Sequence, residues 1–112
     1  HLLQVVSILA MEPPVGFDSE ALRDEKVKVL RALRPSGRRE MVRGQYRGYR
    51  EEEGVDPSSD VETYVALRLG IESWRWAGVP FFIRAGKGMA VTATEVYATL
   101  RRPPQRLFDE PV

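Results

Sequence analysis

The feature that most constrains the fold is an alternating stretch, VETYVALRLGI, at residues 61–71. Apolar side chains and one threonine occupy every second position of this stretch. Successive side chains of a β-strand point to opposite faces, so the alternation predicts a strand with one face in a hydrophobic core. The face predicted to be buried consists of Val61, Thr63, Val65, Leu67, Leu69 and Ile71.

Three other segments predict further strands of the same sheet. Residues 40–46 and 92–101 have a period of two, and residues 79–85 form an apolar run with Pro80 near its start. The connections between the later strands are short and contain no helical segment. A parallel pair needs a long crossover, so these connections favour an antiparallel sheet.

Two segments that precede the strands predict helices. Residues 1–11 are apolar on most sides, so we expect a buried helix, with a strand as the alternative because several residues are β-branched. Its polar stripe, which would face a neighbouring element or a cleft, is His1, Gln4 and Ser7. A second helix is predicted from a cap at Asp18 or Ser19 to about Leu33. Helices followed by strands predict the α+β class, with a mostly antiparallel sheet backed by the N-terminal helices.

The composition is typical of one soluble domain. The chain has 112 residues, of which 43% are hydrophobic and 29% charged, and its formal net charge is +1. Neither a membrane span nor a signal peptide is recognisable, so we expect a cytoplasmic protein with no membrane partner. The absence of cysteine excludes disulfides, thiol catalysis and cysteine-bound zinc. The small net charge makes no general case for a nucleic-acid partner.

The two ends differ from those of a complete domain. His1 leads directly into LLQVVSILAM without a capping residue, and RRPPQRLFDEPV at residues 101–112 follows a strand pattern. We therefore expect residues 1–112 to be a single partial domain, a truncated part of a larger sheet domain. No GxGxxG follows a predicted strand, so we expect a Rossmann domain to be absent.

One lysine is presented between two glycines in GVPFFIRAGKG, residues 78–88. Glycine permits a bend and close approach to the backbone, which leaves Lys87 as the charge at that bend. The P-loop pattern is not met, because Phe81 and Gly88 stand where it requires glycine and serine or threonine. Lys87 is therefore either an anion-binding residue or a solvated turn residue.

His1 is the only histidine, which excludes a site with several histidine ligands. An imidazole titrates near neutral pH, so on the polar stripe of the first helix it could act as a general base if a carboxylate oriented it. The alternative is that His1 is simply the residue at which the sequence begins. Ser7 has no acid-base partner nearby in the sequence, so we do not expect a catalytic triad.

An arginine-rich stretch interleaved with Tyr46 and Tyr49 is the feature that favours nucleic-acid binding. Arginines neutralise phosphates and tyrosines stack on bases, so an RNA-binding surface is one interpretation. Three glutamates at residues 51–53 follow at once and offset this charge. The other interpretation is a solvated strand edge whose charges deter pairing with another sheet. The arginines are Arg34, Arg38, Arg39, Arg43, Arg47 and Arg50.

Two further clusters predict structure rather than catalysis. Trp74 and Trp76 favour a hydrophobic corner over a ligand platform. On the second helix, Asp24 and Lys28 are spaced as an i,i+4 pair. The charges of residues 23–26 favour a network that joins this helix to the sheet.

Several motifs, in their order and spacing, resemble a known family. HLLQ leads into AME-P, and RDEKVKVLRAL, GQY and ETYVALRLGIESWRWAGVPFFIRAGKG follow, before a TEV strand. This set resembles the C-terminal domain of bacterial glucose-6-phosphate dehydrogenases. The resemblance extends over nearly the whole chain.

The resemblance implies a reaction, a cofactor and two site residues. Members of the family bind NADP in an N-terminal Rossmann domain, and an α+β domain forms much of the sugar-phosphate pocket. They oxidise C1 of glucose 6-phosphate to 6-phosphogluconolactone, in the pentose phosphate pathway, and transfer the hydride to the nicotinamide. The general base of the family corresponds to His1 and a substrate-binding lysine to Lys87, whose flanking glycines would let the sugar phosphate approach. We expect the two side chains to converge on one substrate.

Some features of the family are missing or changed. The aspartate that orients the base and the DHYLGK-type phosphate motif lie outside residues 1–112. Some relatives carry a substrate-contacting basic residue where Thr92 stands here. Certain eukaryotic relatives bind a second, structural NADP near the position of Arg84, a role that we do not transfer to this chain.

The resulting hypothesis is a piece of an NADP-dependent glucose-6-phosphate dehydrogenase. We expect the piece alone to be inactive and to bind no cofactor, and we expect a homo-oligomer formed through the sheet, which sedimentation would test. One alternative is a structural or interaction module derived from this domain, distinguished by the reading frame upstream of His1. The other is an RNA-binding module, distinguished by a steep salt dependence of RNA affinity.

Overall fold

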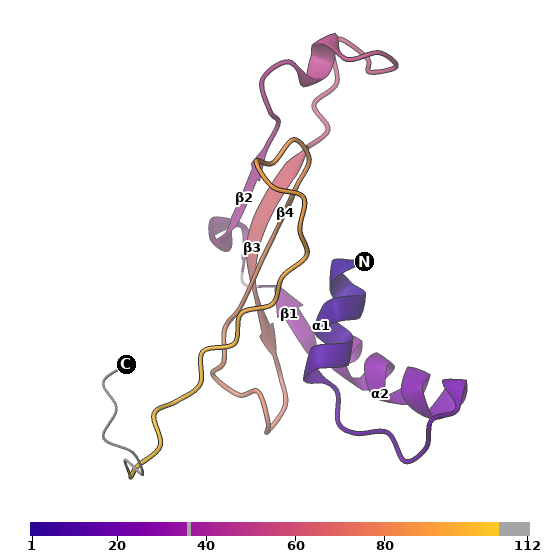
Figure 1. Ribbon diagram of the computed structural model, residues 1–112, viewed down its shortest axis with the longest axis vertical. Helices are drawn as coiled ribbons and strands as arrows, with labels where there is room; N and C mark the ends of the chain where they lie inside the picture. The colour runs from indigo at the N-terminus through magenta and orange to yellow at the C-terminus, as the bar shows by residue number, and fades with distance from the viewer. Residues whose placement is uncertain (36, 106–112) are drawn as a thin grey trace.

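The computed structural model describes residues 1–35 and 37–105 and shows two helices packed against a four-stranded antiparallel sheet (Figure 1). Ser36 and the end of the terminal RRPPQRLFDEPV stretch, from residue 106, lie outside the described residues. The α+β class with an antiparallel sheet is confirmed. The elements are α1 (Leu2–Ala10), α2 (Ser19–Ala32), β1 (Leu33–Pro35), β2 (Met41–Gly44), β3 (Tyr64–Ile71) and β4 (Phe81–Gly86), with short 3-10 helices η1 (Arg38–Glu40) and η2 (Tyr49–Glu51).

The sheet is organised around β3, the strand predicted from the alternating stretch. β4 pairs along one edge of β3, and β2 and β1 pair in succession along the other edge, all antiparallel. Leu67, for example, lies opposite Met41 of β2 and Ile83 of β4. The predicted inner face is buried at Thr63, Leu69 and Ile71, whereas Val61 precedes the strand and is exposed.

The hydrophobic core lies where the two helices meet the sheet. Its buried members are Val6 and Ala10 of α1, Val29 of α2 and Ile71 of β3. Trp76 closes this core from the β3–β4 connection, because its ring meets the Phe81 ring edge-on with centroids 5.1 Å apart. The indole Nε1–H also donates a hydrogen bond of 2.8 Å to the carbonyl oxygen of Ala10.

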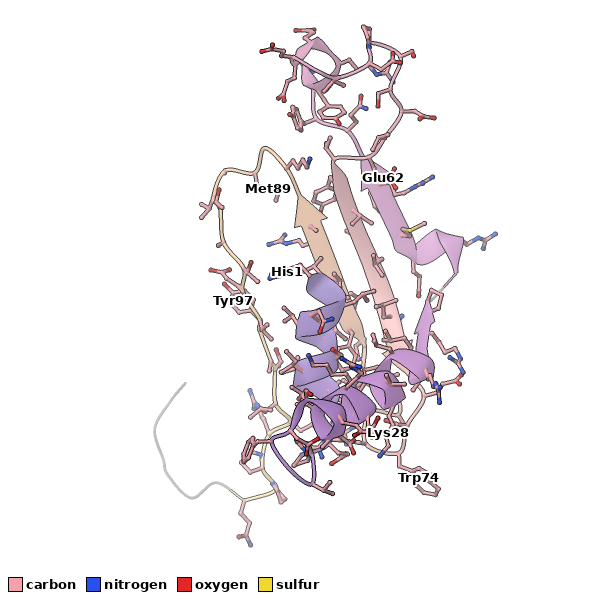
Figure 2. All side chains as sticks on the ribbon, turned by 90° about the vertical axis from the view of Figure 1, so that its right-hand side faces the viewer. His1, Lys28, Glu62, Trp74, Met89 and Tyr97 are labelled. Carbon is pink, nitrogen blue, oxygen red and sulfur yellow. The ribbon has the colours of Figure 1, made fainter. Side chains whose placement is uncertain are left out.

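The predicted tryptophan corner is therefore confirmed for Trp76 and wrong for Trp74. Trp74 is 103% exposed, and Figure 2 shows its side chain projecting from the lower end of the molecule, on the β3–β4 connection. Trp76→Phe removes the hydrogen bond to Ala10 and should lower the free energy of unfolding by about 1 kcal/mol in urea denaturation. The exposed control, Trp74→Phe, should change it by less than about 0.5 kcal/mol. Equal effects of the two substitutions would contradict this account of the corner.

Helix α1 forms as predicted, but the expectation that it is buried on most sides is wrong. Leu3 and Ile8 are each 53% exposed, because α2 and the sheet cover only one side of the helix. Its polar stripe faces a neighbouring element, since Lys26 Nζ of α2 donates a hydrogen bond of 3.1 Å to Gln4 Oε1. Ser7 is fully buried, and its hydroxyl donates to the carbonyl oxygen of Gln4.

Helix α2 begins at the predicted cap, because the Asp18 carboxylate accepts a hydrogen bond of 2.9 Å from the Ala21 N–H. The predicted charge pairing differs from the observed one. Lys28 binds Glu25 at 3.0 Å, an i,i+3 pair on the same helix face, instead of Asp24. The one bond from this cluster to another element is that of Lys26 to α1, so within the described part of the chain the network joins helix to helix and not to the sheet.

Among the described residues, one predicted strand does not form, and one observed strand was not predicted. Residues 92–101 form no strand in the described part of the chain, and Figure 2 shows Tyr97 on a segment that runs beside β4. Alternation of side chains does not suffice for a strand, because the backbone groups also need a partner strand. Conversely, the sequence predicts the end of a helix at residues 33–35, but these residues form β1. Pro35 is tolerated there because β1 lies at the edge of the sheet.

No helix in residues 1–35 or 37–105 is long and apolar enough to cross a membrane.

Candidate functional site

Lys87 lies in the turn that follows β4, as the sequence predicts. Gly86 is the last residue of the strand, and Gly88 has a φ of +64°, a conformation that glycine adopts without strain. The backbone N–H of Lys87 donates a hydrogen bond of 2.8 Å to the carbonyl oxygen of Thr63. The Lys87 side chain is exposed, so its ammonium group is available to an anion.

Both glycines beside Lys87 are in contact with the protein's own side chains. A Cβ on Gly86 would lie only 2.9 Å from the Tyr64 ring and 2.9 Å from the sulfur of Met89. A Cβ on Gly88 would lie 3.3 Å from the Tyr46 ring. The glycines therefore give room to the Tyr46 and Tyr64 rings and to the Met89 side chain, which pack against the turn. That they also let a sugar phosphate approach, as the family resemblance implies, stays a prediction.

Thr63 connects this turn to the end of β2. Its side chain is buried, its N–H donates to the carbonyl oxygen of Gly44 at 2.9 Å, and its Oγ1 accepts a hydrogen bond of 2.9 Å from the Tyr46 N–H. Together with the bond from Lys87, these contacts bring three separate stretches of chain together at one residue. Thr63 is thus the junction between the lysine turn and the segment that follows β2.

The Tyr46 side chain is held at both its ring and its hydroxyl. Its ring meets Tyr49 edge-on at 5.4 Å, and its hydroxyl donates a hydrogen bond to the Glu52 carboxylate. That hydrogen bond, assisted by desolvation, raises the pKa of Tyr46 to about 12. A tyrosine hydroxyl is protonated at neutral pH even at its ordinary pKa, and the raised pKa extends to more alkaline pH the range in which Tyr46 donates to Glu52.

His1 is the N-cap residue of α1. Its carbonyl oxygen accepts a hydrogen bond of 3.2 Å from the Val5 N–H, while its imidazole is exposed and makes no capping bond. Figure 1 and Figure 2 both show α1 beside the sheet with its His1 end directed toward the end at which β4 terminates. Met89, just beyond Lys87, lies at that same end (Figure 2).

The other features singled out from the sequence have mostly local partners. Arg34 pairs with Glu72 at 3.0 Å, and Arg43 with Glu62 at 3.5 Å. A shallow hollow of about 360 Å³ lies beside this second pair, and neither His1 nor Lys87 lines it. Its lining residues are Arg43, Gly44, Gln45, Asp60, Val61 and Glu62. Across residues 1–35 and 37–105, no cluster of three or more histidine, aspartate or glutamate side chains could hold a metal ion.

Sequence reasoning did not connect Tyr46, Thr63 and Tyr64 with Lys87. The two glycines were a signal that something approaches the turn, but their spacing does not say what. Arg84, by contrast, is where the alternation of β4 puts it, on the exposed side of the strand.

Comparison with known proteins gives a consistent result. Residues 1–112 match the family described as "Glucose-6-phosphate dehydrogenase, C-terminal domain". The chain is 53% identical over 108 residues to glucose-6-phosphate 1-dehydrogenase 1 of Mycobacterium tuberculosis. That alignment covers 96% of this chain and 23% of the relative. It is 44% identical over 122 residues to glucose-6-phosphate 1-dehydrogenase of Bacillus subtilis, covering 96% of this chain and 25% of the relative.

Two solved structures resemble this fold. One is the crystal structure of glucose-6-phosphate 1-dehydrogenase from Mycobacterium avium, with a TM-score of 0.73 and 57% identity over 77% of this chain and 19% of that chain. The other is a glucose-6-phosphate dehydrogenase in complex with its substrate glucose-6-phosphate, with a TM-score of 0.68, 44% identity and the same coverage. The chain thus spans about a quarter of the length of the curated relatives that it matches.

Proposed function

Because the chain belongs to the glucose-6-phosphate dehydrogenase family, in its C-terminal domain, we propose that it forms part of the substrate domain of an NADP-dependent glucose-6-phosphate 1-dehydrogenase. The observation that carries this proposal is the match of all 112 residues to that domain. The substrate is supported by the structural neighbour that is 44% identical and was solved with glucose 6-phosphate. The reaction is the oxidation of glucose 6-phosphate at C1 to 6-phosphogluconolactone.

In this proposal His1 is the general base. Its imidazole accepts the proton of the C1 hydroxyl while hydride leaves C1, so that no high-energy cation forms on the sugar. The exposed imidazole of the structure is free of a capping bond to α1, and it is therefore available for this transfer. The helix that carries it is anchored through Val6 and Ala10 in the core, which gives the base a rigid support.

Lys87 is the substrate-binding residue. An ammonium group that donates hydrogen bonds to an anionic sugar phosphate makes charge-assisted bonds, which are stronger than those between neutral groups. The turn presents this group at the end of β4 and is itself bonded to Thr63. Lys87 thereby orients the hexose so that its C1 hydroxyl reaches the base.

We do not expect the described residues to form an NADP site of the Rossmann type. Their strands pair only in antiparallel fashion, and a dinucleotide fold requires parallel strands joined by a helix that starts with a glycine-rich turn. We propose that NADP, the hydride acceptor, binds to a nucleotide-binding domain outside residues 1–112. Residues 1–112 would then supply only the base and part of the sugar-phosphate pocket.

The proposal is tested with the product of the complete gene that encodes this segment. With NADP and glucose 6-phosphate, it should form NADPH, and with unphosphorylated glucose the rate at equal concentration should fall by at least about 100-fold. The 112-residue chain by itself should form no NADPH. Absence of activity in the complete product would refute the proposed function, and NADPH formation by the short chain would refute the placement of NADP.

A further inference from the structure

We propose that Tyr46 and Thr63 are positioning residues that fix the turn carrying Lys87, and that the loop after β2 serves to hold Tyr46 in place. This inference rests on the proposed function, since it assumes that Lys87 binds the sugar phosphate. It assigns a role to a stretch of chain that the proposed reaction does not otherwise use. That stretch, residues 45–63, is called the brace loop below.

The turn is fixed by contacts on more than one side. The Lys87 N–H is bonded to the Thr63 carbonyl oxygen, and the Tyr46 ring lies against Gly88 on the C-terminal side of the lysine. On the N-terminal side, the Tyr64 ring and the Met89 side chain lie against Gly86. These contacts involve the backbone of the turn, so they leave the lysine side chain free while restraining the Cα from which it extends.

The lysine turn and Tyr46 are joined through hydrogen bonds to Thr63. Its carbonyl oxygen accepts from Lys87, and its Oγ1 accepts from the Tyr46 N–H, so the lysine turn and the tyrosine are bonded to the same residue. Thr63 is buried, and a buried hydrogen bond is not easily exchanged for one with water. Displacement of Tyr46 would therefore remove the ring from Gly88 while leaving the Thr63–Lys87 bond in place.

The brace loop is built around Tyr46. Gln45 Nε2 donates hydrogen bonds of 3.0 Å to the carbonyl oxygens of Ser59 and Val61, which closes the base of the loop. At the tip of the loop, the Glu52 carboxylate accepts a hydrogen bond from the Tyr46 hydroxyl. Backbone bonds from Glu51 to Gly48 and from Glu52 to Tyr49 give the tip its 3-10 turn. The loop thus restrains the tyrosine at its backbone and at its hydroxyl.

This restraint matters because a lysine side chain is long and flexible. Its backbone must be fixed for the ammonium group to meet the substrate in one place, and a misplacement of about 1 Å at a reacting site can cost up to about 100-fold in rate. A braced turn has less conformational freedom to lose when the substrate binds, so binding costs less conformational entropy. Loss of the brace should therefore weaken substrate binding and leave cofactor binding unchanged.

The test compares variants of the complete gene product in steady-state kinetics. Tyr46→Ala should raise KM for glucose 6-phosphate by about tenfold, whereas KM for NADP should change by less than about twofold. Tyr46→Phe is the intermediate variant: it keeps the ring against Gly88 but loses the bond to Glu52, one of the two restraints that the brace loop places on the ring. Its KM should therefore rise, by less than that of Tyr46→Ala and by no more than about threefold. Thr63→Val, which removes the acceptor for the Tyr46 N–H, should raise KM for glucose 6-phosphate with the same selectivity.

The decisive variant is the double substitution Tyr46→Ala with Lys87→Ala. If Tyr46 acts through Lys87, the double variant should have the same KM as Lys87→Ala alone, because there is no longer an ammonium group to position. The positioning role would be overturned if the KM increase of the double variant were the product of the increases of the two single variants. It would also be overturned if neither Tyr46→Ala nor Thr63→Val changed KM for glucose 6-phosphate. If Tyr46→Ala does not fold, Thr63→Val takes its place in the double variant.

The same set of variants distinguishes a failure of the positioning role from a failure of the proposed role of Lys87. If Lys87→Ala leaves KM for glucose 6-phosphate unchanged, the proposed role of Lys87 is wrong, and the positioning role is wrong with it. If Lys87→Ala raises KM but the substitution at Tyr46 or Thr63 multiplies that effect, only the positioning role is overturned.

Discussion

Replacement of His1 by asparagine in the complete gene product is expected to lower kcat for glucose 6-phosphate oxidation by about 1,000-fold, with KM changed by less than about threefold. Asparagine cannot accept the C1 hydroxyl proton at neutral pH, so hydride would have to leave an unassisted alcohol. In the proposed function the sugar phosphate is bound by other groups, Lys87 among them, so its binding should persist. Stopped-flow or steady-state measurement of NADPH formation gives both constants.

The asparagine variant also controls for the stability of α1. His1 is the N-cap residue and makes no side-chain capping bond, and asparagine is among the preferred residues at such a position. The substitution should therefore not fray the helix, and circular dichroism should be unchanged. A kcat within about tenfold of wild type would show that His1 is not the general base.

Replacement of Lys87 by alanine is expected to raise KM for glucose 6-phosphate by about 100-fold, which corresponds to the loss of one charge-assisted interaction of about 3 kcal/mol. The backbone bond from residue 87 to Thr63 does not depend on the side chain, so the turn should keep its conformation. KM for NADP should be nearly unchanged. Isothermal titration with glucose 6-phosphate should give a matching increase in Kd.

Lys87→Arg is the matched control because it keeps the positive charge. A guanidinium group differs in shape and reach from an ammonium group, so this variant should bind the substrate more weakly than wild type but more tightly than the alanine variant. Equal KM values for all three proteins would mean that Lys87 is a solvated turn residue, the alternative that the sequence leaves open.

The parts of the fold that were predicted correctly are those with a strong local period. The alternation in residues 61–71 predicted a strand, which forms as β3 over Tyr64–Ile71 with Leu69 and Ile71 buried on the predicted face, and the Asp18 cap predicted where α2 begins. The failures occurred where a second element had to be known. Residues 92–101 alternate as regularly as a strand but have no partner in the described part of the chain, and α1 is apolar on sides that no described element covers.

The candidate site shows the same division. The sequence predicted that Lys87 is presented at a bend between glycines, and the structure has it there. It did not indicate that Tyr46 and Tyr64 occupy the space beside these glycines, or that Thr63 bonds the turn. The convergence of His1 and Lys87 on one substrate stays a prediction.

By itself, the sequence determined the period of each main element, the cap of α2 and the position of the one lysine held between glycines, because these depend on neighbours within a few residues. Only the tertiary structure decided which side chains meet that lysine turn. Thr63 and Tyr46 are 24 and 41 residues away from Lys87 in the chain. A contact across such a separation is set by how β2, β3 and β4 pair, and no local pattern of residues specifies that pairing.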